Sequence, residues 1–173
     1  GERPSPAMRS AARRTISAPS GGISHEAFVS SLIQSGLAAL SAGTVDAGID
    51  CLRRAVSDAE KIKGGVLRAR ATLELGTALV HSVRGFDDEG AVLLLQSTEL
   101  ARAAGDGGIA AAGFRELGYV EALAGRRPVA ERYLRRALDL AEYRNDLAGI
   151  HAVIGFNLVD WGRPAQGLEH YEL

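Results

Sequence analysis

The chain has 173 residues, of which 46% are hydrophobic and 24% charged, and this length and composition predict one ordered domain. The 20 basic and 21 acidic residues leave a net charge of −1, which excludes a strong overall attraction to nucleic acid or to an anionic membrane. No apolar run approaches the ~20 residues that cross a bilayer, and the single cysteine, Cys51, excludes an internal disulfide. Nearly all basic residues are arginine, which suggests a GC-rich bacterial gene, and the single cysteine fits a reducing, cytoplasmic compartment.

Residues 1–23 are predicted to form a flexible linker or tail. The stretch GERPSPAMRSAARRTISAPSGG, residues 1–22, is rich in Pro, Ser, Gly and Arg and shows no apolar periodicity. A transit peptide shares the Arg- and Ser-rich, acid-poor composition. The chain begins with Gly1 rather than Met, which favours a linker inside a larger protein.

From residue 24 onwards a pattern of glycines recurs. Its origins are 40, 42 and 37 residues apart, at Gly36, Gly76, Gly118 and Gly155. Each origin is followed 7 to 9 residues later by another glycine: Gly43, Gly85, Gly125 and Gly162. Self-similarity at this period indicates a solenoid. The repeat predicts four units, the last one incomplete, at about 24–63, 64–105, 106–145 and 146–173.

Each unit is predicted to be a pair of helices. In the third unit, IAAAGFRELGYVEALAG carries apolar residues on one helical face and ends at Gly125, while Pro128 fits the first turn of the next helix. The fourth unit repeats this arrangement with Gly162 and Pro164. The expected N-caps are Thr44, Asp87 or Asp88, Asp106 and Asp146. No alternating run with hairpin signals is present, so we expect an all-α fold.

The four origin glycines fall in the middle of predicted helices, where each costs about 1 kcal/mol relative to alanine. A common cause is therefore needed. The partner helix also carries a small residue at its matching position: Gly48, Gly90, Ala130 or Gly167. Small residues facing small residues let two antiparallel helices approach closely, and the larger side chains around them then interlock.

These residues resemble the tetratricopeptide repeat family over about residues 24–173. The family's order of a small residue in the first helix, a small residue early in the second, a large apolar residue and then alanine is met by Gly118, Ala130, Leu134 and Ala137. It is met again by Gly36, Gly48, Leu52 and Ala55. Two departures are a period longer than the family's usual ~34 residues and the replacement of the proline that closes the second helix by Glu60 and Glu142.

The resemblance implies a right-handed α-solenoid of about four antiparallel helix pairs, which binds a peptide or protein. The long-period stretch ATLELGTALVHSVRGFDDEGAVLLLQSTELARAAGD also resembles the repeat array of large LuxR-type, ATP-binding bacterial transcriptional regulators. That likeness implies a fragment of a regulator in which the repeats act as the sensor.

Motifs for catalysis, metals or cofactors are missing from the sequence. There is no phosphate-binding Gly-x-x-x-x-Gly-Lys-Ser/Thr run. His25, His81, His151 and His170 lie far apart and away from Cys51, so no zinc spacing arises. Cys51 is expected to pack as an ordinary thiol, and the acids of FDDEG, residues 86–90, to complement a helix N-terminus rather than to hold a metal. We expect no enzyme activity, cofactor or metal.

The tetratricopeptide resemblance implies that the first helices of successive units line a concave groove. The groove residues expected to contact a partner are Arg70, Leu73, Thr77, His81, Arg115, Tyr119, Phe156 and Asp160. Mixed aromatic and cationic side chains suit a peptide, although Tyr119 and Phe156 could equally be core. Ile33 and Leu37 stand where the family's carboxylate clamp places polar residues, which disfavours that ligand. A second hypothesis is an anionic small molecule held by Arg70 and Arg115 in a pocket between helices.

Two further features concern the surface: paired arginines on the second helices and apolar residues in the last unit. The pairs Arg53–Arg54 and Arg135–Arg136 share repeat positions on second helices and are expected on the outer face, with stems over apolar neighbours. Without a helix-turn-helix signal they predict no direct contact with nucleic acid. In the last unit, Leu168, Tyr171 and Leu173 would leave an apolar face, which suggests an excised fragment or a homodimer through this end.

Overall fold

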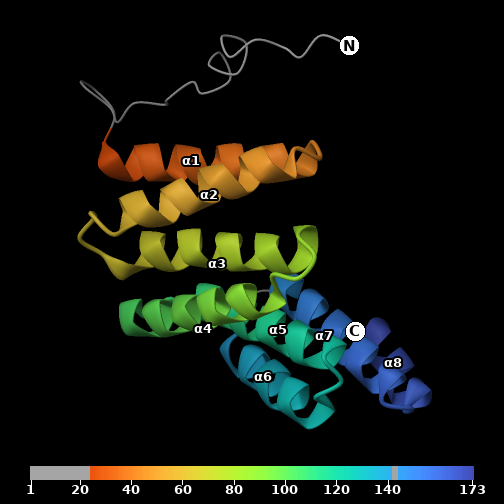
Figure 1. Ribbon diagram of the computed structural model, residues 1–173. Helices are drawn as coiled ribbons and strands as arrows, with labels where there is room; N and C mark the ends of the chain where they lie inside the picture. Colours follow the sequence, from red (N-terminus) through yellow and green to blue (C-terminus); the bar gives the residue numbers. More distant parts are fainter. Residues whose placement is uncertain (1–23, 142–143) are drawn as a thin grey trace, which may run out of the picture.

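A computed structural model describes residues 24–141 and 144–173 of the chain (Figure 1), so the expected tail at residues 1–23 lies outside the described residues. Within these ranges every regular element is an α-helix, and none is long and apolar enough to span a membrane. The helices are α1 His25–Ser41, α2 Val45–Ala59, α3 Gly65–Ser82, α4 Asp87–Ala104, α5 Gly107–Leu123, α6 Arg127–Leu140, α7 Arg144–Asp160 and α8 Pro164–Tyr171.

The helices stack as consecutive pairs, which Figure 1 shows as layers from α1 down to α4 that continue at a turned angle through α5 to α8. The first helices of neighbouring units contact one another, as α1 does with α3, α3 with α5 and α5 with α7. Among the described residues the backbones of neighbouring second helices lie farther apart, although the side chains of Arg53 on α2 and Glu89 on α4 form an ion pair at 2.9 Å. Because the first helices lie closer together, they form the inner, concave side of the stack.

The interiors of the helix pairs confirm the contact of small residues against small. A Cβ atom built on Gly36 would lie 3.1 Å from the carbonyl oxygen of Gly48, and one built on Gly48 would lie 3.0 Å from that of Gly36. The Gly76–Gly90 and Gly155–Gly167 pairs repeat this reciprocal approach at 2.9 to 3.1 Å. Backbone therefore packs against backbone at the centre of these pairs, and glycine is required there.

A buried leucine covers the origin glycine in each of the first three units. A Cβ on Gly118 would lie 2.6 Å from Cγ of Leu134, and Leu52 and Leu94 occupy the same place over their own glycines. The next small position holds Ala55, Ser97 and Ala137, all fully buried. Ser97 fits there because its hydroxyl donates to the carbonyl of Ala69 at 2.7 Å.

The helix ends follow the sequence in part. Asp106 caps α5 by accepting from the backbone N–H of Ile109 at 2.8 Å, as expected, and Gly125 turns the chain after α5 with φ +75°. Ser24, which was not predicted, caps α1 by accepting from the N–H of Ala27 at 3.1 Å. Thr44 stands at the N-cap of α2, but its hydroxyl donates to the carbonyl of Ala39 at 2.8 Å instead of capping.

The expected aspartate caps of α4 and α7 are wrong in position. The N-cap of α4 is Phe86, so Asp87 and Asp88 lie in the first turn, where their charge still complements the helix dipole. Helix α7 begins at Arg144, which places Asp146 in its first turn and puts the expected unit boundary inside the helix. Helix α4 thus starts at the first of its two predicted caps, and α7 starts two residues before its predicted cap.

The outer surface and the last unit carry exposed side chains. The guanidinium of Arg54 lies 5.6 Å from the ring centre of Phe28, and that of Arg136 lies 5.7 Å from that of Phe114, so in both residues the charged head lies over an aromatic ring, where the sequence predicted only the stem to pack. Cys51 is half-buried in α2. Helix α8 has only 8 residues. Its face leaves apolar side chains exposed at Leu168, Tyr171 and Leu173.

Candidate functional site

The inner face brings together side chains from three successive first helices, α3, α5 and α7. Of the predicted groove residues, His81, Arg115, Tyr119 and Phe156 lie in one connected group. The member that joins them, Glu116 of α5, was not predicted. It is 5% exposed and accepts hydrogen bonds from two neighbours.

Glu116 bridges α3 and α5. Its Oε2 lies 2.7 Å from Nε2 of His81, and since a carboxylate accepts, Nε2 carries the proton. Its Oε1 accepts from Nε and Nη2 of Arg115 at 2.9 and 2.6 Å. A buried carboxylate with two cationic or donor partners is a stable arrangement, because its charge is both paired and hydrogen-bonded.

The protonation of this cluster follows from those contacts. Burial alone would raise the pKa of Glu116, but the hydrogen bond from His81 and the charge of Arg115 together outweigh it and hold the pKa below its usual value. The same hydrogen bond raises the pKa of His81 against the opposing effect of burial. Near neutral pH, Glu116 is therefore ionised, and His81 holds its proton more firmly than a free imidazole does.

An aromatic row continues from His81 across the groove. The imidazole stacks on Tyr119 with ring centres 4.9 Å apart and planes 22° apart. Tyr119 in turn meets Phe156 of α7 at 6.0 Å in a tilted arrangement. His81 is exposed and the other two rings are half-buried, so part of each ring is accessible to solvent.

Charged residues border this row on α3. Nε of Arg70 lies 3.9 Å from Oε1 of Glu74, and the side chain of Arg70 is 53% exposed. Burial raises the pKa of Glu74, while the charges of Arg70 and Arg115 oppose the rise. Each guanidinium thus faces a carboxylate, and the cluster of two arginines and two glutamates is close to neutral. The anion-binding alternative has no excess of positive charge here and stays a prediction.

Helix α7 makes room for Arg115. A Cβ on Gly149 would lie 3.0 Å from Nη1 of Arg115, so the guanidinium rests against the backbone of α7. A side chain at residue 149 would press on that guanidinium, which the two bonds to Glu116 hold in place. The groove lining is therefore tied to α7 as well as to α3.

The remaining predicted residues lie at the edges of this group or beneath it. Leu73 is buried in the core beside Phe114 and Leu117, and so supports the groove from below. Thr77 is half-buried on α3. Asp160, at the end of α7, forms an ion pair with Arg127 of α6. The structure therefore joins four of the eight predicted residues directly.

In the described part of the chain, no group of three His, Cys, Asp or Glu side chains is placed to hold a metal ion. His151 and His170 meet as a pair, with their Nδ1 atoms 2.8 Å apart, outside the groove cluster. The inner face therefore presents the three packed rings of the aromatic row and the half-exposed guanidinium of Arg70.

Comparisons with known proteins address the fold. No protein-family model and no curated protein matches the chain. Among solved structures, MamA AMB-1 in crystal form P212121 is 26% identical, covers 87% of this chain and 79% of that one, and has a TM-score of 0.57. The chain has a tetratricopeptide-repeat-like fold. MamA MSR-1 in crystal form C2 is 20% identical over 83% of this chain and 92% of that one, with a TM-score of 0.32.

Proposed function

We propose that the protein is an interaction module that binds a peptide or protein segment in the concave groove. The observation that carries this proposal is the row His81–Tyr119–Phe156, which spans α3, α5 and α7 and is anchored by buried Glu116. Helical solenoids use their concave faces as extended binding surfaces. Rigid aromatic rings held by their neighbours are suited to bind an apolar anchor at little entropic cost.

The charges of the groove define the partner further. Arg115 is neutralised by Glu116, whereas Arg70 is half-exposed and its distance from Glu74 is at the limit of an ion pair. Arg70 can therefore turn towards an acidic side chain of a ligand. We infer a peptide with an apolar or aromatic anchor for the rings and an acidic residue positioned for Arg70.

The binding test begins with peptides selected from a random displayed library against the folded chain. Tyr119→Ala and Arg70→Ala should each weaken the selected peptides about tenfold or more, as expected for residues that carry most of an interface. Arg53→Ala is the matched control, because Arg53 lies on the second helix α2, is also about half-exposed at 49%, and also pairs with one glutamate, Glu89. Circular dichroism checks that helicity is retained.

Two outcomes contradict the groove assignment. One is undiminished binding by both groove variants, and the other is an equal loss with Arg53→Ala. Arg115 is kept out of the test set because its removal would leave Glu116 buried without its guanidinium and would mix a loss of stability with a loss of binding.

The wider setting proposed for the module is the sensor array of a cytoplasmic bacterial transcriptional regulator. The long repeat period supports this reading. The coding sequence on either side of this segment tests it: an ATP-binding module upstream and a helix-turn-helix downstream are expected, and their absence from both sides would refute it.

Self-association through the last unit is part of the same proposal. Leu168 is 61% exposed and Leu173 is 73% exposed, and both lie next to Tyr171 on or just after α8. Exposed apolar side chains of this kind favour contact with a second copy. Leu168→Glu should lower the molar mass measured by light scattering if the chain dimerises there, and a mass that the substitution leaves unchanged at the dimer value would place the contact elsewhere.

A further inference from the structure

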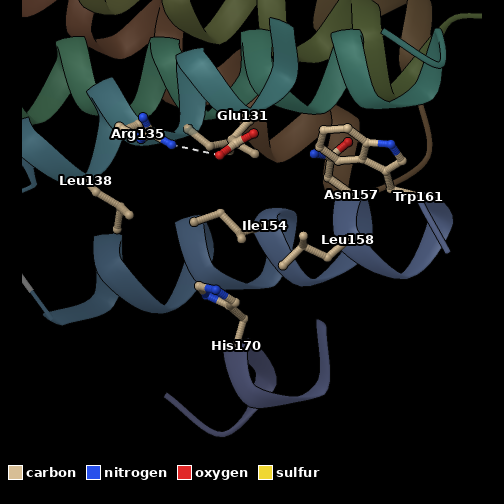
Figure 2. Close-up of a pocket in the computed structure, with 9 residues that line it drawn as sticks. Glu131, Arg135, Leu138, Ile154, Asn157, Leu158, Trp161 and His170 are labelled. Atoms are coloured by element: carbon tan, nitrogen blue, oxygen red, sulfur yellow. Dashed lines mark hydrogen bonds and ion pairs between the residues drawn. The ribbon is translucent and has the colours of Figure 1, made fainter. Parts of the chain in front are cut away.

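A cavity of about 200 Å³ lies where α6, α7 and α8 meet (Figure 2). Figure 2 shows Leu138, Ile154 and Leu158 reaching into the space between α6 and α7, with His170 approaching from α8. Leu134 and Trp161 complete the apolar wall, to which Asn157 adds a single amide. The site shares no residue with the His81–Tyr119–Phe156 row.

Two positions that line this cavity carry polar residues where the second and third units carry apolar ones. Asn157 stands two residues after its origin glycine, and the same position holds Ala78 in the second unit and Val120 in the third. Both of those residues are buried in apolar clusters. Of the second, third and fourth units, only the fourth therefore carries an amide where the others carry an apolar core side chain.

A second position changes in the same way. His170 stands eight residues after its turn glycine, where the second and third units carry Leu93 and Tyr133. Leu93 and Tyr133 pack against the apolar clusters of their junctions. The last junction thus has polar residues at two positions that are apolar in the second and third units, and both residues line the cavity.

Asn157 has an unused hydrogen-bond acceptor. The residue is only 2% exposed, and its Nδ2 donates to the carbonyl of Arg127 at 3.5 Å, which assigns the other amide atom as Oδ1. Oδ1 is buried and has no hydrogen-bond partner within the described residues. Buried acceptors in proteins nearly always have a donor, so this oxygen calls for one from outside the described residues.

The charged groups of the cavity are paired with each other. Glu131 and Arg135, at the rim on α6, form an ion pair at 2.7 Å. His170 contacts His151 through Nδ1, and both burial and that neighbour lower the pKa of His170, so its ring is uncharged near neutral pH. The lining therefore offers apolar walls, ring faces, the amide of Asn157 and Nε2 of His170, which donates or accepts according to the tautomer.

We propose that this cavity binds a small, uncharged aromatic molecule with one O–H or N–H group, and that the amide of Asn157 turns on binding so that its Oδ1, which is buried in the free chain, accepts from that group. The volume sets the size of the ligand, since an apolar cavity of about 150 Å³ holds one benzene ring. The cavity here is somewhat larger and fits a ring with a small substituent. Trp161 and His170 provide faces on which such a ring can stack.

The test uses phenol and toluene, which have nearly the same shape and differ in the donor. Trp161 is the only tryptophan of the chain, so its fluorescence, excited at the red edge of the indole band, reports occupancy directly. Phenol should give a saturable change. Because toluene is more hydrophobic, the informative quantity is the ratio of the two affinities, compared between the wild type and Asn157→Val.

Asn157→Val introduces the residue that the third unit carries at this position. The preference for phenol, expressed as that ratio, should fall about fivefold or more in the variant, which is the worth of one net hydrogen bond. Asn157→Ala, the residue of the second unit, provides a second variant if the first does not fold. Two results overturn the proposal: an unsaturable response to phenol, as for a cavity that holds water alone, or a ratio that neither substitution changes.

Discussion

Replacing Gly90 with alanine adds one methyl group at the closest approach between α3 and α4. The new Cβ would lie 2.6 Å from Cγ2 of Val80 and 3.0 Å from the carbonyl oxygen of Gly76, whereas ordinary contacts begin at 3.4 Å. Val80 is β-branched and stiff about χ1, and the carbonyl belongs to the backbone. Neither neighbour can move without shifting a helix by most of an ångström.

The magnitude follows from two opposing terms. Alanine gains about 1 kcal/mol over glycine in a helix, and overpacking a core costs about 1–3 kcal/mol. The backbone contact places Gly90→Ala at the upper end of that cost. We therefore expect a net loss of about 1–2 kcal/mol in the free energy of unfolding, which lowers the melting temperature by about 2–8 °C for a chain of this size.

Unfolding followed by circular dichroism measures this loss against a matched control. Gly108→Ala also places alanine in a helix, but its Cβ would meet only Asp106 Oδ1 at 3.6 Å, so stability should be unchanged or rise by up to about 1 kcal/mol. In a Val80→Ala background the cost of Gly90→Ala should shrink by about 0.5 kcal/mol or more. A stabilising Gly90→Ala without coupling to Val80 would refute the close-packing explanation.

Three further outcomes are expected. The hydrogen bond to Glu116 raises the pKa of His81, so this pair stabilises the fold fully below pH 6.5, and the stabilisation is lost as the pH rises through the raised pKa of His81. Glu116→Gln should lower the pKa of His81 measured by NMR. Burial and a neighbouring histidine lower the pKa of His170, so stability is lost as pH falls below 6.5, and His170→Leu should remove that loss in acid melting curves. Asp106→Ala should cost about 0.5–2 kcal/mol in urea unfolding, as the loss of a helix cap does.

The architecture could be predicted because it depends on residues whose physical role is local and repeated. Gly36, Gly76, Gly118 and Gly155 are costly in a helix, so their shared register required a packing cause, and the structure supplies it. Helix starts were less predictable. Thr44 was expected to cap α2, but a hydroxyl can donate as well as accept, and in the structure it donates to the preceding turn.

The site could be predicted only where side chains repeat at groove positions. His81, Tyr119 and Phe156 were found in this way, and their stacking needed the structure. Glu116 was missed because an acid in a helix is ordinarily solvated, and its burial depends on His81, which lies 35 residues away. Nothing in the sequence distinguished Asn157 either, since its unpaired oxygen becomes visible only when the surrounding volume is known.

Each first helix uses one face to pack against its partner helix and another face to line the inner side of the stack. The glycine contacts fasten each helix pair from within, so the face of a first helix that looks into the groove is free to vary. On α5 this face carries Tyr119, while the face towards α6 carries Gly118, one residue away. The row from His81 to Phe156 crosses three first helices, so a peptide that contacts all three rings would contact α3, α5 and α7 together. Because those helices lie on the inner side of the stack, we expect such a peptide to resist changes in their spacing and therefore in the curvature of the solenoid.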